Sequence, residues 1–314
     1  MPTALSYPGL RCVLEFLDPM KRIHIASRNH SLQTIDKTIP IWIKDLGINL
    51  NCLSMKYYAI DNYIDNKFRF KNRHGKYFER IWPSNLKPEE ARKKLFNSYL
   101  RVKSKIYVNC FFFFTAIPDF VPTNLLFQIN ELICSSHYID GFLPVIDPSS
   151  FPLKKFRTGI DELDHLNYPV LTSAQELTVL HGLGGLTQLI NEINTNKLVI
   201  FEKYSFRAAD PVSLIKSWKE NGKEIGTTFK FHDYKAFLRV MHILLQELKE
   251  FENEKFNNHS SNCPRLMIPI NKTAEIHVSQ NNENYIVVEV VPITLKRETD
   301  ATEEACSSKR VRHS

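Results

Sequence analysis

The stretch YVNCFFFFTAI, residues 107–117, contains the most apolar run of the chain, from Cys110 to Ile117. Lys105 and Asp119 flank this run closely, and it is far shorter than the roughly 20 residues that cross a bilayer as a helix. The consecutive phenylalanines at 111–114 therefore predict a core strand that is buried on both faces. We expect no membrane association.

Short apolar strands are expected to recur on the C-terminal side of this run. We expect them at Tyr107–Phe113, Leu126–Ile133, Leu153–Phe156, Leu177–Leu180, Lys197–Phe201 and Thr227–Phe231. Helices are expected between the later strands, at Gly185–Ile193, Pro211–Glu220 and Tyr234–Phe251. The strand spacing falls in the period of leucine-rich repeats, about 20 to 29 residues, whose units stack into a curved solenoid. The ladder Asn of such repeats does not recur regularly, and an ordinary layered α/β domain is the alternative.

The last part of the folded chain has β character. Leu266–Ile270, Glu275–Ser279 and Tyr285–Val291 are separated by short polar turns and predict a small antiparallel meander. Residues 105–296 are thus expected to form a repeat-like α/β domain that ends in this meander. Residues 297–314 are polar, first acidic and then basic, and predict a disordered tail.

Residues 1–38 predict a compact helical unit. Leu10, Val13, Leu14 and Leu17 follow the i, i+3, i+4, i+7 spacing of one helical face. Asp18-Pro19 predicts the start of a second helix, because Asp can accept free N–H groups and Pro fits the first helical position. Ser31 is expected to cap a third helix. So small a unit is not stable alone and is expected to pack on the next segment or on a partner.

Residues 39–104 predict strands, a basic aromatic loop and a helix. Isoleucines alternate with other residues at 39–43, which is typical of a half-buried strand. Asn51–Ile60 indicates another strand, and Asp61–Asn85 indicates a long loop or hairpin. A helix is expected from Pro88 to Leu100, with two glutamates in its first turn that favour a helix N-terminus.

The net charge of +7 is concentrated in one segment. Between residues 67 and 105 there are thirteen Lys or Arg against three Glu. The basic residues Lys67, Arg69, Lys71, Arg73, Lys76 and Arg80 are interleaved with Phe68, Phe70, Tyr77, Phe78 and Trp82. Such a segment can bind phosphates and stack on bases, or it can face an acidic protein surface. It is also what an edge hairpin requires, since Lys discourages unwanted strand pairing, and we favour this interpretation over nucleic-acid binding.

The sequence predicts no enzyme, no cofactor and no metal site. The six cysteines lie far apart without a C-x-x-C pair, which argues against zinc and indicates the reducing cytoplasm or nucleus. The HGLGGL turn at 181–186 matches neither the Rossmann fingerprint nor the P-loop. The acidic cluster at 161–165 is expected to be a solvated turn. A catalytic triad assembled from distant residues stays open, because such sites are defined in space.

The N-terminal unit, LSYPGLRCVLEFLDPMKRIHIASRNHSLQTID at residues 5–36, resembles an F-box. Leu5 and Pro8 stand near the Leu-Pro start of that family. Its first helix is matched by Leu10, Val13, Leu14 and Leu17, and its second and third helices are matched by Ile23, Ile25, Arg28 and Leu32. Asn29 or His30 stands where the family has Trp.

More of the chain is similar to a nematode-expanded family of F-box-like proteins with a C-terminal, F-box-associated type domain of unknown function. The matching segments are LSYPGLRCVLEFL (5–17), RIHIASRNHSLQTIDKTIP (22–40), LIKSWKENGKEIGTTFKF (214–231), MIPINKTAEIHV (267–278) and YIVVEVVPI (285–293). The resemblance implies a protein that links an unknown target to a cullin ubiquitin ligase. The small cullin adaptor would bind a face comprising Pro8, Leu10, Val13, Leu14, Leu17, Ile23 and Leu32. Alternatively, this face packs internally on the strand at 39–43.

These observations together predict an α/β protein. A short N-terminal three-helix F-box-like unit is followed by an irregular leucine-rich-repeat-like strand/helix array and a C-terminal antiparallel β meander. The expected function is a non-enzymatic protein-interaction module, a target-recognition subunit of a cullin-type ubiquitin ligase. The alternatives are an interaction scaffold without adaptor binding, or nucleic-acid binding through residues 67–105.

Overall fold

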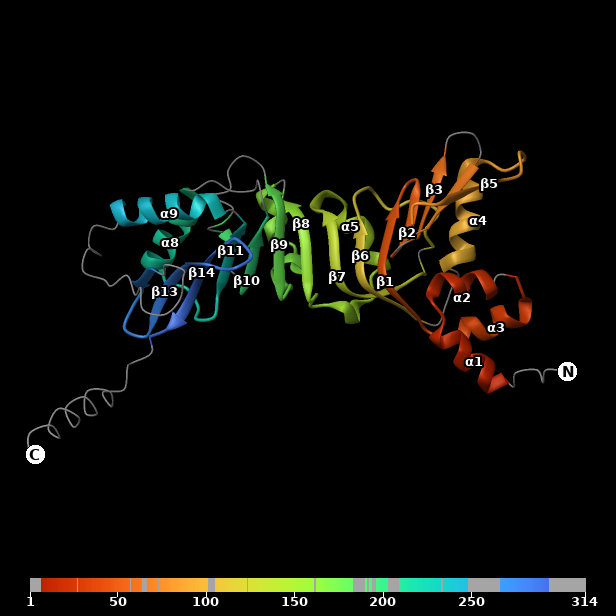
Figure 1. The fold of residues 1–314 in the computed structure, drawn as a ribbon, viewed down its shortest axis with the longest axis horizontal. Coiled ribbons are helices and arrows are strands. Elements are labelled where there is room, and N and C mark those ends of the chain that lie inside the picture. The colour runs from red at the N-terminus through yellow and green to blue at the C-terminus, as the bar shows by residue number, and fades with distance from the viewer. Residues whose placement is uncertain are drawn as a thin grey trace, which may run out of the picture.

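The structure is a computed structural model of the chain, and it describes most of residues 7–293. The gaps within this range are residues 27, 57, 64–66, 73, 101–104, 123, 161, 183–189, 191, 194–195, 203–208, 233 and 248–265. The predicted tail at 297–314 and most of the predicted helix at 185–193 therefore lie outside the described residues. Figure 1 shows an elongated molecule, with the N-terminal helices at one end of its long axis and the C-terminal strands towards the other.

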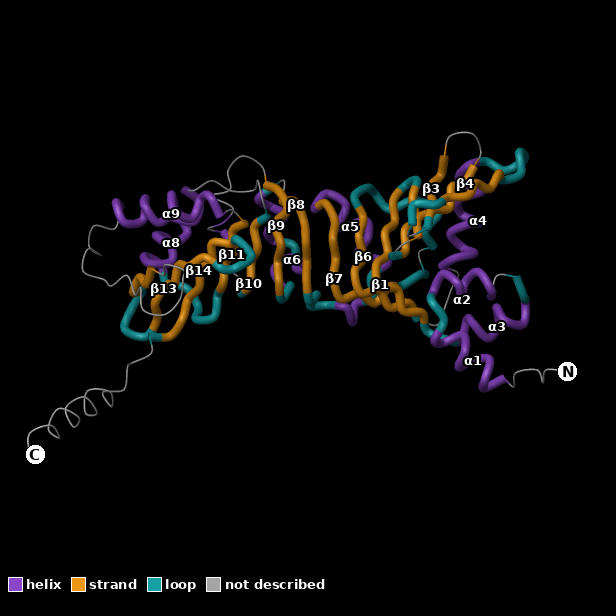
Figure 2. Tube along the Cα trace, viewed as in Figure 1, coloured by secondary structure: helices purple, strands orange, loops and turns teal. Residues whose placement is uncertain are grey.

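Helices occur mainly at the two ends of the molecule and along one side of a central sheet (Figure 2). The helices are α1 (Tyr7–Phe16), α2 (Pro19–Ala26), α3 (His30–Thr38), α4 (Pro88–Leu100), α5 (Ile139–Phe142), α6 (Pro169–Ser173), α8 (Ala209–Asn221) and α9 (Tyr234–Glu247). Short 3-10 turns are η1 (Ser136–Tyr138), η2 (Leu143–Val145), η3 (Pro148–Ser150) and η4 (Leu163–Asn167). None of the described helices is long and apolar enough to span a membrane.

The strands form one 14-stranded sheet in the order β12-β13-β14-β11-β10-β9-β8-β7-β6-β1-β2-β3-β4-β5. They are β1 (Ile41–Asn49), β2 (Cys52–Met55), β3 (Tyr58–Tyr63), β4 (Lys67–Lys71), β5 (Tyr77–Ile81), β6 (Ile106–Phe113), β7 (Phe127–Ser135), β8 (Lys155–Ile160), β9 (Glu176–Gly182), β10 (Leu198–Phe201), β11 (Thr228–His232), β12 (Leu266–Pro269), β13 (Ala274–Gln280) and β14 (Tyr285–Pro292). β1 and β6 to β11 are parallel, and the strands at both ends are antiparallel.

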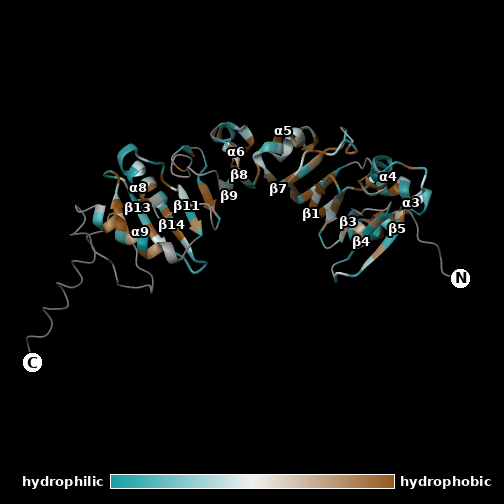
Figure 3. Cartoon of the chain, turned by 90° about the horizontal axis from the view of Figure 1, so that it is seen from above, coloured by the Kyte–Doolittle hydropathy of each residue, from teal (hydrophilic) through white to brown (hydrophobic). Residues whose placement is uncertain are grey.

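The predicted mixed α/β architecture is confirmed, with its N-terminal helices, large sheet and C-terminal antiparallel meander. The meander β12-β13-β14 joins the parallel strands through an antiparallel pairing of β14 with β11. Seen from above, the sheet is an arc with α5 and α6 on its outer side (Figure 3). Whether the parallel array belongs to the leucine-rich repeats stays a prediction.

The core is built from rows of apolar side chains that cross the sheet in register. One row runs through Leu266, Val278, Val288, Phe229, Val199, Leu177, Phe156, Leu132, Phe111, Leu46 and Met55, each paired with the next and each buried. Burying a side chain of this size contributes about 1.5–3 kcal/mol. Because the pairing keeps every second residue on the same face, one alternating pattern in each strand is sufficient to build a continuous core.

The alternation of buried and exposed side chains is interrupted at paired positions of three neighbouring strands. Two consecutive residues that are not buried occur at Lys44-Asp45 in β1, Asn109-Cys110 in β6 and Asn130-Glu131 in β7. At these positions the Asn130 amide donates a hydrogen bond to the Asn109 side chain over 3.2 Å. The sequence shows no regular Asn ladder, but the fold brings these two asparagines of adjacent strands together.

The helix and strand boundaries correct several expectations. Asp18 starts α2 as predicted, since its carboxylate accepts the Met20 N–H at 3.1 Å. The cap of α3 is Asn29 rather than Ser31, because the Asn29 side chain accepts the Leu32 N–H. The single strand expected at 51–60 is instead divided between β2 and β3, which form a hairpin. The segment 61–85, expected to be a long loop or hairpin, holds the hairpin β4-β5. β8 starts two residues later than expected and continues to Ile160.

Candidate functional site

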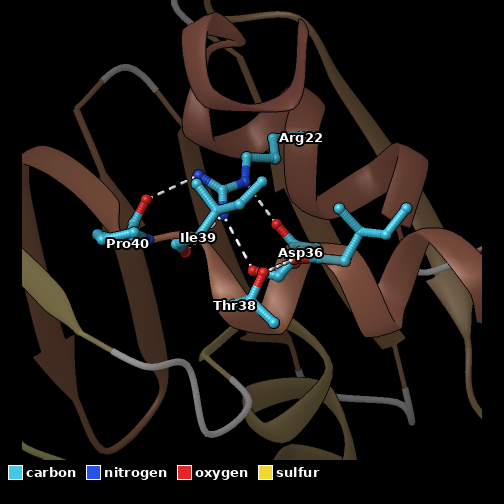
Figure 4. A network of polar contacts seen from close by, with 6 residues as sticks. Arg22, Asp36, Thr38, Ile39 and Pro40 are labelled. Atoms are coloured by element: carbon cyan, nitrogen blue, oxygen red, sulfur yellow. Dashed lines mark hydrogen bonds and ion pairs between the residues drawn. The ribbon is translucent and has the colours of Figure 1, made fainter. Parts of the chain in front are cut away.

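A buried ion pair holds the helical unit, α1 to α3, against the start of the sheet (Figure 4). Arg22 of α2 is 2% exposed and pairs with the Asp36 carboxylate of α3. Its guanidinium also donates to the carbonyl oxygens of Ile39 at 2.7 Å and Pro40 at 2.8 Å. Charge-assisted hydrogen bonds of this kind are short and directional. One side chain therefore fixes α2 relative to both α3 and β1.

The residues predicted to bind the adaptor are divided between the inside and the outside of the helical unit. Leu14 and Ile23 are buried, Leu10, Leu17 and Leu32 are half-buried, and Pro8 and Val13 are exposed. Helix α1 is apolar on its outer side as well, where Phe16 is 85% exposed and Cys12 and Val13 are also exposed. Positions 12, 13 and 16 are neighbours on a helix, so these side chains form one stripe, here named the outer stripe.

The residues of the predicted anionic-partner patch do not form one continuous surface. Lys67 and Arg69 pair with Glu79 on the neighbouring strand, at 3.4 and 3.0 Å. The hydrogen bond from Arg69 is the main reason why the pKa of the Glu79 carboxyl is lowered. Arg73 lies outside the described residues. The remaining three residues, Lys71, Lys76 and Arg80, line a hollow against the helices.

This hollow, here named the basic aromatic groove, lies between strands β3 to β5 and helices α2 and α4. It consists of two adjoining hollows of ≈ 640 and ≈ 360 Å³ that share His24, Phe70 and Tyr99. Its aromatic lining comprises Tyr58, Phe68, Phe70, Tyr77, Phe78, Trp82 and Tyr99, and its cationic lining comprises Lys21, Arg28, Lys71, Lys76, Arg80 and Lys94. Among the described residues that line the groove there is no Asp or Glu.

The rings of the groove are ordered by contacts with one another. The Phe70 and Phe78 rings stack with their centroids 4.8 Å apart, and Phe68 packs against Trp82 at 4.7 Å. Burial raises the pKa of the Tyr99 hydroxyl, and the positive charge of Arg80 opposes this rise. The groove thus combines an aromatic floor with a positively charged rim.

A second exposed aromatic pair lies on the solvent-facing side of the sheet. Trp42 of β1 stacks on Tyr107 of β6 with a centroid distance of 4.0 Å and an interplanar angle of 10°, and Trp42 is 68% exposed. Amide side chains of Asn109, Gln128 and Asn130 line the adjoining surface. Trp42 follows Pro40, whose carbonyl oxygen binds Arg22, so this surface begins next to the junction between the helical unit and the sheet.

Three of the described cysteines, Cys52, Cys110 and Cys134, have a raised pKa. Burial raises the pKa of Cys52 to about 12 and that of Cys110 to about 11, and it also raises the pKa of Cys134. These groups remain thiols at neutral pH, whereas a nucleophile or metal ligand must be a thiolate. Over the residues that the structure describes, no three His, Cys, Asp or Glu side chains gather as a metal site. Of the acidic turn, Asp161 lies outside the described residues, and His165 is buried.

One comparison with known proteins gives a match. A family model described as a domain of unknown function (DUF3557) matches residues 87–233, from just before α4 to just after β11. The match supports the predicted domain of unknown function in the C-terminal part of the chain, and it does not include the helical unit. No curated protein and no solved structure matches the chain.

Proposed function

We propose that this protein is a non-enzymatic protein-interaction module, a target-recognition subunit of a cullin-type ubiquitin ligase. The helical unit would bind a small cullin adaptor, and the sheet and groove would bind the target. The observation that carries the proposal is the outer stripe of α1, where a phenylalanine is left almost entirely in solvent.

An isolated exposed apolar residue is ordinary, but a helix that is apolar on two sides requires a second covering surface. The inner side of α1 is covered, since Leu14 is buried. The outer stripe has no such cover among the described residues. A partner that covers Phe16 and Val13 would complete the burial of α1, and the resemblance to F-box proteins names the partner as the cullin adaptor.

The remainder of the chain supports an elongated recognition surface. The parallel strands β6 to β11 form rows of buried residues with an Asn109–Asn130 side-chain pair between β6 and β7, which is consistent with a leucine-rich-repeat-like array. The proposal includes membership of the nematode-expanded F-box-like family and a cytoplasmic or nuclear location, where cullin ligases act.

Binding of the purified chain to the cullin adaptor, measured by calorimetry, tests this function. Truncation of a ring that anchors an interface costs about 2 kcal/mol or more, which is about thirtyfold in Kd. We therefore expect Phe16→Ala to weaken binding by about that factor. The matched control is Glu15→Ala, because Glu15 is also exposed on α1 but lies off the outer stripe.

Wild-type chain that is folded but does not bind the adaptor would contradict the ligase assignment and leave an interaction scaffold. Adaptor binding that is equally strong in the Phe16→Ala and Glu15→Ala variants would place the adaptor on another surface.

A further inference from the structure

We propose that the basic aromatic groove binds an acidic peptide segment that carries a bulky apolar side chain. The inference deepens the proposed function, because the peptide would belong to the target. The groove itself consists only of this chain's own residues, so it can be tested without the adaptor.

The first argument is the charge of the groove. Six cationic residues line it, from three separate parts of the chain: Lys21 and Arg28 of α2 and the turn after it, Lys71, Lys76 and Arg80 of the β4-β5 hairpin, and Lys94 of α4. Of these, Lys71 pairs with Tyr77 and so alternates in the hairpin with the Phe70–Phe78 pair. Within the described residues none of these six forms an ion pair, whereas Lys67 and Arg69 of the same hairpin both pair with Glu79. Like charges that line one hollow without a carboxylate among them create a positive potential that favours an anionic partner.

The second argument is the apolar floor. Phe70 is half-buried beneath Phe78, which is 59% exposed, and Tyr58 and Tyr99 extend the same surface. The hollow of ≈ 360 Å³ that these rings line falls within the size of small-ligand sites, about 300–1,000 Å³. An aromatic or large aliphatic side chain fits such a space, and the flanking cations would then contact carboxylates on either side of it.

The third argument is an unpaired donor in the wall of the groove. Trp82 is 6% exposed, and its indole N–H is buried without a hydrogen-bond acceptor in the described part of the chain. A buried donor without a partner costs about 1–3 kcal/mol. A peptide carbonyl or carboxylate oxygen that reached this wall would supply the acceptor. The unpaired indole N–H, the cationic residues and the lack of Asp or Glu among the described lining residues all favour an anion that carries several oxygen atoms.

An acidic peptide fits these observations better than a nucleic acid. Single strands are bound by stacking successive bases on accessible rings along a continuous basic track. Here the Phe68 and Trp82 rings are buried, and the Phe70 ring lies against Phe78. The basic track is also interrupted, since Glu79 neutralises Lys67 and Arg69.

The test is fluorescence anisotropy of the full chain with dye-labelled probes. One probe is a nonapeptide of aspartates and glutamates around a central tryptophan. The second has the acidic residues replaced by their amides, the third has alanine in place of tryptophan, and the fourth is a single-stranded oligonucleotide. We expect the first probe to bind at least tenfold more tightly than each of the other three, and its affinity to fall as salt is added.

The matched variants are Lys94→Glu and Lys93→Glu, which change neighbouring exposed lysines of α4, only the first of which lines the groove. We expect Lys94→Glu and Phe78→Ala each to weaken binding at least fivefold, with Lys93→Glu close to wild type. Unfolding curves establish that each variant folds. Equal binding by both lysine variants, or tighter binding of the oligonucleotide or the amide peptide, would overturn the proposal. Adaptor affinity, measured separately on Lys94→Glu, distinguishes this failure from failure of the ligase assignment.

Discussion

The centre of the sheet and its N-terminal end share one side-chain pattern but differ in what covers it. In the centre, rows such as Phe156, Leu132 and Phe111 are buried at every position. At the N-terminal end, one row continues through Ile48, Leu53, Ile60, Phe70 and Phe78 in register. Along this second row the exposure rises from 1% at Ile48 to 59% at Phe78. Strand alternation places the side chains on one face of the sheet, and the helices that cover this face decide whether the side chains are buried or exposed.

The largest expected effect comes from truncating one ring in each region. Phe111 is fully buried and contacts the Phe127 and Phe142 rings. We expect Phe111→Ala to lower the free energy of unfolding by about 3–5 kcal/mol. For Phe78→Ala we expect about 0.5 kcal/mol or less, because the ring is mostly in solvent. Urea denaturation measures both, and similar losses would show that the two regions are packed alike.

The next largest effect is expected where the helical unit joins the sheet. Arg22→Met would leave the Asp36 carboxylate buried without its cation, at a cost of about 3 kcal/mol. The backbone amides of α2 and α3 should then lose protection from hydrogen exchange first, while those of β6 to β11 stay protected. Adding Asp36→Leu should restore most of the stability.

Lys37→Met, which changes an exposed residue of α3, is the control for this prediction. Loss of protection throughout the sheet in Arg22→Met would mean that the two regions unfold as one unit.

A smaller effect is expected from the close approach of Phe112 to Gly47 in the neighbouring strand. A Cβ atom at Gly47 would lie 2.2 Å from the Phe112 ring and 2.4 Å from the Ser54 hydroxyl. We expect Gly47→Val to destabilise the protein by about 1–3 kcal/mol through overpacking. Gly141→Ala, whose Cβ would meet only Ile117 at 3.7 Å, should not destabilise. Thermal unfolding compares the two, and an unchanged midpoint in Gly47→Val would show that the β1–β6 contact is looser than described.

The smallest effect concerns reactivity rather than stability. Burial and the charges of Glu131 and Asp45 raise the pKa of Cys110 to about 11, so its thiolate fraction should grow only as the pH approaches that value. At pH 8 iodoacetamide should label exposed Cys12 faster than Cys110, as followed by mass spectrometry. The variant Glu131→Gln should speed the labelling of Cys110. An unchanged rate would show that burial alone controls this thiol.

Much of the central sheet could be predicted from the sequence. The strands at 107–113 and 227–231 and the helix at 211–220 carry local apolar patterns that the fold retains. The expected burial of residues 111–114 on both faces is wrong, because Phe111 and Phe113 are buried whereas Phe112 is half-buried and Phe114 is 51% exposed. The start of α2 at Asp18-Pro19 can also be predicted from the sequence, because the capping residue and the first helical turn lie within three residues of each other. The hairpin β4-β5 at the sheet edge is also the one expected from the alternating basic and aromatic residues at 67–81. The turn that divides residues 51–60 into β2 and β3 is not predicted, because no Gly or Pro marks it.

The groove could not be predicted in the same way. Sequence proximity grouped Lys67 and Arg69 with Lys71, Lys76 and Arg80, but a cross-strand Glu79 removes the first two from the set. The other cationic residues of the groove come from α2, the turn after it and α4, and their position beside the hairpin depends on how the hairpins lie against the helices. Arg22 offered a weak signal, as a cation on the same helical face as Ala26, but its partner Asp36 lies on another helix.

The order of strands in the sheet has a consequence for how the chain folds. Among the described strands, every pairing except β1 with β6 and β11 with β14 joins strands that are consecutive in the sequence. The separation of paired residues is therefore small relative to the length of the chain, a property that correlates with rapid folding. In such an array folding can begin at several places and spread from strand to neighbouring strand. The two longer closures, which bring β1 to β6 and β14 to β11, are then the steps that we expect to limit the rate.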